Sequence, residues 1–94
     1  MPYVLVRHKV TNYASWKTVF DQDGATRQAN GSQGGRLFRN AQDPNEVVIL
    51  LEWSDLEKAR QFTQSQDLRE TMRKAGVLDI PDIYFLEELE QVAM

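Results

Sequence analysis

The stretch EVVILLEW, residues 46–53, decides the fold of this chain. Within it, residues 47–51 form a run of five aliphatic side chains with no polar alternation. Such a run is typical of a central strand that is covered on both faces. Because successive side chains of a strand point to opposite faces, helices on one side can bury only one set of alternate residues, for example Val47, Ile49 and Leu51. Val48 and Leu50 then need a second cover.

Working outward from this strand, the sequence predicts three more strands and two helical regions. The other strands are expected over residues 3–10, 33–41 and 83–89, where β-branched and aromatic residues are frequent. Apolar residues recur at three- and four-residue steps over residues 13–30 and 54–76, which predicts helices. The order β-α-β-β-α-β is that of an α+β, ferredoxin-like fold with a four-stranded antiparallel sheet. We expect a single domain over residues 1–94.

Local polar residues predict where these elements begin. Asn12 suits the N-cap of the first helix. Ser54 with Glu57 fits a capping box for the second helical region, and Ser65 predicts a restart within it. Residues 43–46, with Pro in second position, predict the turn of a hairpin.

The composition limits the chemistry and the partners. The 94 residues contain no Cys, so disulfides, thiolate nucleophiles and thiolate metal sites are excluded. The single His argues against a zinc site. The formal net charge of −3 offers no positive field to nucleic acid or anionic lipid, and we expect neither as a partner. With no long apolar run and no secretion signal in the sequence, the expected localisation is cytoplasmic.

The second cover for the central strand is predicted to be another copy of the chain. In a ferredoxin-like sheet both helices lie on one face, so Val48 and Leu50 would form a bare apolar patch with residues of the first strand. On a monomer, such a patch marks an association site. Two copies related by a two-fold axis would cover it, which predicts a homodimer with the two sheets facing each other.

Four stretches carry a resemblance to a known family. They are VRHKVTNYASWKTVFD (residues 6–21), RNAQDPNEVVILLEWSDLEKARQF (39–62), SQDLRETMRKAGV (65–77) and PDIYFLEEL (81–89). With these stretches, the chain resembles the antibiotic-biosynthesis-monooxygenase-like domains of the dimeric α/β-barrel superfamily. The resemblance implies a homodimeric α/β barrel in which each protomer holds a pocket between its sheet and its helices.

The resemblance also implies a range of activities, because one fold hosts many functions. Family members include cofactor-independent monooxygenases of aromatic polyketide rings and haem-degrading enzymes. The haem-degrading branch has a Trp where this chain has Trp53, but it takes its iron ligand from a His of the second helical region. Residues 54–76 contain no His. We therefore expect no cofactor.

In the cofactor-independent branch, polar and aromatic side chains hold an ionisable ring and assist its deprotonation, and the substrate carbanion then reacts with oxygen. This resemblance implies that aromatic and apolar residues of the chain line the pocket or bind the substrate. They are Phe20, Phe38, Trp53, Phe62, Met72 and Tyr84.

His8 is the candidate catalytic base, because imidazole changes charge near neutral pH. Strand alternation groups it with Val4, Val6 and Val10, and we expect this face to be the dimer-facing one. Glu52 on the neighbouring strand would orient the imidazole if both lie on one face, which a register shift of one residue would reverse. The alternative is a histidine hydrogen-bonded at the barrel rim without a catalytic role.

Two functions from different classes are compatible with these observations. The first is a small monooxygenase that acts, without metal or flavin, on an apolar or aromatic compound, with His8 as base and Trp53 as a stacking surface. The second is a non-catalytic dimer that binds a small molecule or responds to stress, in which both side chains serve packing.

Overall fold

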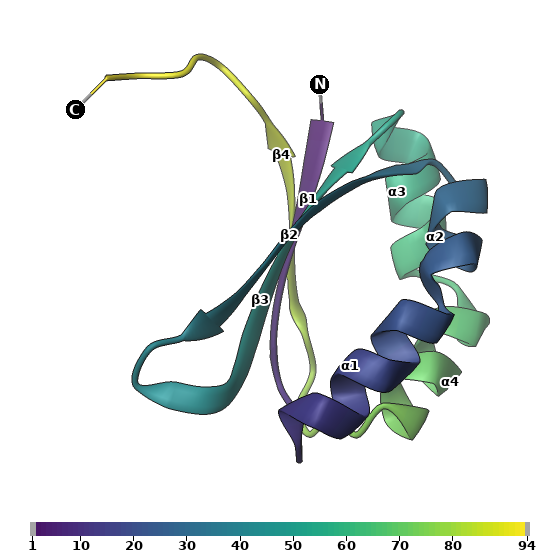
Figure 1. The fold of residues 1–94 in the computed structure, drawn as a ribbon. Helices are drawn as coiled ribbons and strands as arrows, with labels where there is room; N and C mark the ends of the chain where they lie inside the picture. The colour runs from purple at the N-terminus through teal and green to yellow at the C-terminus, as the bar shows by residue number, and fades with distance from the viewer. Residues whose placement is uncertain (1, 94) are drawn as a thin grey trace.

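The computed structural model describes residues 2–93. Within these residues, four strands form one antiparallel sheet in the order β2-β3-β1-β4, and the helices pack on one face of it (Figure 1). The elements are β1 (Pro2–Lys9), α1 (Tyr13–Gln22), α2 (Gly24–Ala29), β2 (Ser32–Asn40), β3 (Asp43–Trp53), α3 (Leu56–Thr63), α4 (Gln66–Lys74) and β4 (Asp82–Glu87). The predicted ferredoxin-like order is confirmed, with each helical region divided into two short helices.

The register of β3 decides which side chains meet the helices. β3 lies between β1 and β2, and its pairing with β1 places Val47 opposite His8 and Ile49 opposite Val6. Directly opposed residues of an antiparallel pair share one face of the sheet. These four residues are buried under the helices, whereas Leu50 points to the other side. The odd-numbered residues of the apolar run therefore face the core.

The core fills the layer between the sheet and the helices. Its buried hydrophobic side chains are Val4, Val6, Val10, Trp16, Val47, Ile49, Trp53, Ala59, Phe62 and Ala75. Aromatic residues of α1 extend this layer, because the Trp16 ring stacks on the Phe20 ring at 4.9 Å between centroids. Large aromatic surfaces contribute strongly to the stability of a core as small as this one.

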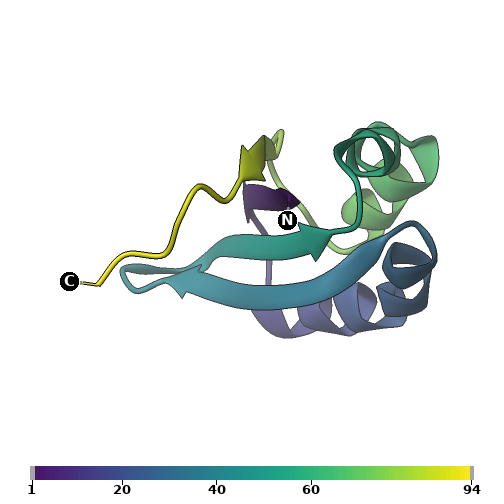
Figure 2. The same cartoon turned by 90° about the horizontal axis from the view of Figure 1, so that it is seen from above.

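The second face of the sheet carries no helix, as Figure 2 shows from above. We call it the open face. Its apolar side chains, placed by the strand registers, are Leu5, Phe38, Val48, Leu50, Tyr84 and Leu86. The open face therefore has the apolar character from which the homodimer is predicted.

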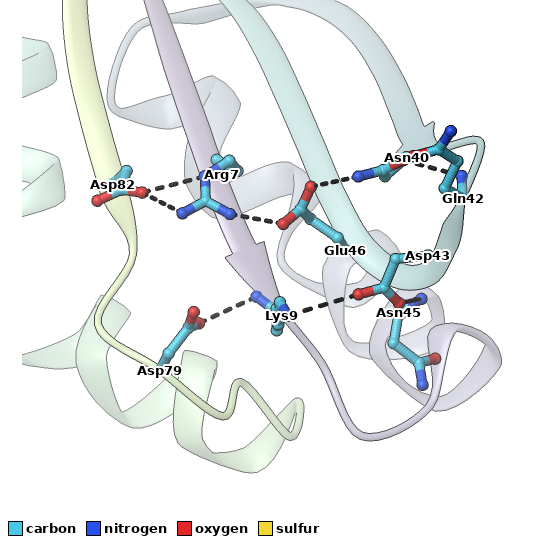
Figure 3. A network of polar contacts seen from close by, with 9 residues as sticks. All are labelled: Arg7, Lys9, Asn40, Gln42, Asp43, Asn45, Glu46, Asp79 and Asp82. Atoms are coloured by element: carbon cyan, nitrogen blue, oxygen red, sulfur yellow. Dashed lines mark hydrogen bonds and ion pairs between the residues drawn. The ribbon is translucent and has the colours of Figure 1, made fainter.

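A network of polar contacts closes one end of the open face (Figure 3). Arg7 donates from Nε and Nη2 to Asp82 Oδ2 at 3.0 and 2.6 Å, and from Nη1 to Glu46 Oε1 at 2.6 Å. Asn40 Nδ2 donates to the other oxygen of Glu46 at 2.8 Å. These four side chains come from β1, β4, β3 and β2, so the network joins every strand of the described sheet.

The helix caps confirm two predictions and correct one. Asn12 Oδ1 accepts from Ser15 N at 3.0 Å, and Ser65 Oγ accepts from Leu68 N at 3.2 Å, as expected of N-caps. The prediction of Ser54 as the cap of α3 is wrong by one residue. Asp55 Oδ1 accepts from Lys58 N at 3.0 Å instead. The backbone N–H of Ser54 donates to Gly31 O at 2.9 Å, which keeps Ser54 tied to the loop before β2 and delays the helix.

The hairpin turn lies earlier than predicted. Asn40 pairs with Asp43, so the turn consists of residues 41–42 and β3 already begins at Asp43. Asn40 Oδ1 accepts from Gln42 N at 2.8 Å, and Asp43 Oδ1 accepts from Asn45 N at 3.0 Å. Because short polar side chains can bond their own backbone two residues on, they form the turn before Pro44 is reached.

Candidate functional site

A cavity of about 70 Å³ lies between the sheet and the helices, and we call it the inner cavity. β1 contributes His8 to its wall, β3 contributes Trp53, and α1 contributes Phe20. α3 and α4 close the opposite side with Phe62 and Met72. Most of the lining side chains are apolar, so a ligand here would be largely removed from water.

His8 is buried in this wall, with 2% of its surface exposed. Its ring meets the Trp16 ring edge-on, at 5.6 Å between centroids and an interplanar angle of 77°. Among the described residues, neither Nδ1 nor Nε2 has a hydrogen-bond partner. Burial lowers the pKa of His8 from its ordinary value of 6.5, and the carboxylate of Asp79 opposes that shift.

These features define what His8 can do chemically. A lowered pKa keeps the imidazole neutral at neutral pH, with one N–H to donate and one lone pair to accept a proton. Leaving such a group buried without a partner costs about 1–3 kcal/mol. A polar ligand in the inner cavity could satisfy one of these nitrogens.

Trp53 is held rigidly at the end of β3. Its Nε1 donates to Asn30 O at 3.1 Å, and its ring lies 5.3 Å from the Phe62 ring. The backbone passes close at Gly31, which has φ +116°, and a Cβ there would stand 2.8 Å from Trp53 Nε1. Glycine is therefore required at this point, and the indole enters the cavity wall in a fixed orientation.

Comparison with known families identifies the chain. The sequence model of the antibiotic biosynthesis monooxygenase family matches residues 8–74, more than half of the chain. The chain belongs to this family. The match begins at His8 and spans every helix of the described structure.

Solved structures share the fold of this monooxygenase-family member. It is similar to a proposed antibiotic biosynthesis monooxygenase from Bordetella bronchiseptica, at 17% identity over 95% of this chain and 97% of the other, with a TM-score of 0.77. It is also similar to SnoaB, a cofactor-independent oxygenase from Streptomyces nogalater, at 15% identity over 99% and 97% of the two chains, with a TM-score of 0.76. At such identities, the likeness establishes the fold alone. Curated protein sequences give no match.

The structure brings together five of the predicted site residues of this monooxygenase-family chain and separates two. His8, Trp53, Phe62 and Met72 line the inner cavity, as does Phe20. Phe38 was expected to line the pocket and Tyr84 to bind the substrate, but neither lines the inner cavity. Phe38 pairs with Val48 and Tyr84 with Leu5, so both lie on the open face, where they are 49% and 56% exposed.

The expected side of His8 is wrong, and the condition for its orientation by Glu52 is not met. His8 faces the helices and not the open face, because its strand neighbours Val4 and Val6 are buried in the core. Glu52 pairs with Tyr3, five residues along β1 from His8 and on the opposite face of the sheet, so it cannot orient the imidazole. The alternation along β1 is as expected, but the side on which the helices pack was assigned incorrectly.

Arg27 was not among the predicted site residues, yet it lines the inner cavity. Its Nη1 donates to Phe20 O at 2.7 Å, and its guanidinium lies 3.6 Å from the centre of the Phe20 ring. A signal was present in the sequence, because Arg27 follows Phe20 by seven residues and Asp23 by four, on one helical face. The break at Gly24 obscured that periodicity.

Neither a metal-binding cluster nor a membrane-spanning helix is found among the described residues. No group of three or more His, Cys, Asp or Glu side chains within residues 2–93 is arranged to hold a metal ion. Among the helices of residues 2–93, none has the length and apolar character needed to cross a membrane.

Proposed function

We propose that this protein is a cofactor-independent monooxygenase that oxidises a small aromatic compound in the inner cavity, with His8 as the base. The observation that carries the proposal is the buried, neutral imidazole of His8, whose two nitrogens have no partner among the described residues. Membership of the monooxygenase family and similarity to SnoaB, which is described as a cofactor-independent oxygenase, support the same reaction class.

The reaction is balanced without an external reductant. His8 takes a proton from an acidic ring methylene, and the resulting carbanion adds to O₂. The imidazolium returns the proton to the peroxide anion, which gives a hydroperoxide. Loss of water across the O–O bond leaves a carbonyl, so the sum is CH₂ + O₂ → C=O + H₂O. An apolar cavity suits this sequence, because the exclusion of water limits protonation of the carbanion by solvent.

The inner cavity must widen to admit an aromatic ring. Its volume is about 70 Å³, whereas an enclosed apolar cavity of about 150 Å³ holds a single benzene molecule. Met72 lines the cavity and can change its shape readily, because its thioether chain has three rotatable bonds. Trp53 is fixed by its hydrogen bond to Asn30 O, so it would provide the constant stacking surface.

Oxygen consumption tests the proposed reaction. We expect the protein to consume one O₂ per molecule of anthrone, a ketone with an acidic ring methylene. Replacing His8 by Gln should lower kcat by about 100-fold or more, the usual contribution of a general base, while substrate affinity changes little. The Glu70→Gln variant, on an exposed position of α4, serves as the control and should retain full activity.

The outcome also separates the two candidate functions. Tight binding of an aromatic compound without oxygen uptake would support the non-catalytic, ligand-binding function, which the small volume of the inner cavity favours. Equal oxygen uptake by the wild type and by His8→Gln would exclude His8 as the base.

We further propose that the protein acts as a homodimer whose open faces pack against each other. The support is the apolar centre of the open face, where Leu5, Val48 and Leu50 lie side by side on paired strands. An apolar sheet face of this kind is stabilised by a second, self-complementary copy. Sedimentation at micromolar concentration should give a dimer, and a monomer under these conditions would contradict the proposal.

A further inference from the structure

Arg27 stands between two hollows of the molecule. The inner cavity is one of them, and the other is an outer groove of about 420 Å³ between α2 and β2. Three residues, Phe20, Arg27 and Leu51, line both hollows. A ligand could therefore extend from one hollow into the other past the Arg27 side chain.

The two hollows differ in chemical character. The inner cavity is walled mainly by apolar and aromatic side chains, whereas the outer groove has Gln28, Gln33 and Arg36 in its wall. Its wall also includes Gly34, where a Cβ would meet no atom within 4 Å. A ligand that spans both would have an apolar body and a polar end.

The guanidinium of Arg27 has N–H groups without a hydrogen-bond acceptor among the described residues, at the boundary between the inner cavity and the outer groove. Only 13% of its side chain is exposed, and it packs over the Phe20 ring. Nη1 donates to Phe20 O and lies 4.0 Å from Asp23 Oδ2, the outer limit of an ion pair. Among residues 2–93, no hydrogen bond involves Nε or Nη2. A largely buried guanidinium with free N–H groups is suited to bind a planar anion in a bidentate manner.

We propose that Arg27 is a specificity-determining residue that binds the carboxylate, or a similar anionic oxygen, of a ligand whose aromatic ring lies in the inner cavity beside His8. This inference rests on the proposed function, because it assumes that the inner cavity takes an aromatic ring. It goes further by assigning the substrate class: an aromatic compound with an anionic substituent directed toward the outer groove.

The electrostatics of the site agree with this assignment. Burial lowers the pKa of Arg27 from its ordinary value, while the carboxylates of Asp23 and Asp21 oppose that shift, and the group stays cationic at neutral pH. Removal from water strengthens the attraction of the guanidinium for an anion. Asp23 neutralises the guanidinium only in part at 4.0 Å, so an incoming carboxylate can compete for it.

A matched pair of probes tests the inference: naphthalene-2-carboxylate and naphthalene-2-carboxamide, which have the same rings and differ in charge. Their dissociation constants can be measured by NMR titration of the full chain, which is small enough for resolved backbone spectra. The wild type should bind the carboxylate about tenfold more tightly than the amide. Arg27→Gln should abolish this preference while the amide binds as before, and Arg27→Lys should keep part of it.

Two further variants control for charge and for Asp23. Arg69→Gln removes the same charge from an exposed position of α4 and should keep the tenfold preference. Asp23→Asn combined with Arg27→Gln removes the carboxylate that Arg27→Gln would leave without its partner, and the preference should still be absent. Dispersed backbone spectra identify the variants that fold.

The outcomes distinguish this inference from the proposed function. Equal binding of the two probes by the wild type, or a preference that survives Arg27→Gln, would overturn the role of Arg27 and leave the inner cavity as an aromatic site. Failure of both probes to bind would overturn the aromatic site together with the role of Arg27.

Discussion

The two faces of the sheet are built from the same strands, but they differ in how their polar side chains are hydrogen-bonded. On the open face, the partly exposed Arg7 makes three hydrogen bonds to Asp82 and Glu46. On the helix-covered face, the buried His8 makes none with the described residues. If stability were the only requirement, the buried side chain would be the hydrogen-bonded one. An unpartnered polar group lowers the free energy of unfolding most where water is excluded. Arg7 therefore links strands of the open face, whereas the two ring nitrogens of His8 have no partner among the described residues.

The largest expected effect lies on the covered face. Ile49→Ala should lower the free energy of unfolding by about 3–4 kcal/mol, because it removes a buried side chain next to the inner cavity. Chemical denaturation at several protein concentrations measures this loss. The matched control is Ile80→Ala, where the side chain is 91% exposed and the change should stay within about 0.5 kcal/mol. Similar losses in both variants would contradict the assignment of the core.

A substitution on the open face should weaken the association of two copies of the chain. Leu50→Asp places a charge in the centre of the proposed dimer interface and should raise the dimer dissociation constant by about 100-fold, or about 2.7 kcal/mol. Analytical ultracentrifugation over a range of concentrations measures it. Leu78→Asp introduces the same charge at an exposed residue outside the sheet and should leave the dimer intact. If both variants stay dimeric, the open face is not the interface.

A smaller effect with the opposite sign is expected at His8. His8→Leu replaces an unpartnered imidazole by an apolar side chain of similar size and should raise the free energy of unfolding by about 1 kcal/mol. The same variant should also lack the proposed oxygenase activity. Thermal unfolding and oxygen uptake, measured on one sample, check both. A variant clearly less stable than the wild type would contradict this prediction, because it would show that the imidazole of His8 stabilises the fold.

The smallest expected effect is the pH dependence of stability. Because burial places the pKa of His8 in the folded state below 6.5, the unfolded chain binds more protons in the interval beneath that value. The titration of His8 therefore leaves the free energy of unfolding unchanged above pH 6.5 and lowers it as the pH falls through the interval. Denaturation midpoints between pH 7.5 and 5.5 should decrease more for the wild type than for His8→Leu. Parallel curves would contradict a buried neutral imidazole.

Much of this fold could be predicted from local sequence. Asn12 and Ser65 cap their helices as expected, because capping depends on residues within one turn. The errors at Ser54 and at residues 43–46 arise where another hydrogen bond forms in place of the expected one. Ser54 N is bound by Gly31 O, and Asn40 forms the turn with its own side chain. Such competition depends on partners that periodicity cannot identify.

The candidate site was predictable only in part, for a different physical reason. Trp53 and Phe62 line the inner cavity as expected, but Phe38 and Tyr84 lie on the open face. Both are aromatic residues of a type that commonly lines a pocket. The face to which it points depends on pairing register, which the sequence leaves undetermined by one residue. Arg27 was not predicted because the helix breaks before Gly24, which interrupts the helical periodicity between Phe20 and Arg27.

The sequence by itself determined that residues 47–51 form a central strand with apolar side chains on both faces, because alternation along a strand is a local property of the backbone. It also determined that His8, the one His of the chain, is the first candidate for acid–base chemistry near neutral pH. Only the tertiary structure decided that His8 lies on the helix-covered face, without a partner among the described residues and beside Trp53 and Arg27. That choice depends on the side on which the helices pack, which is set by the packing of the whole chain and not by any segment alone.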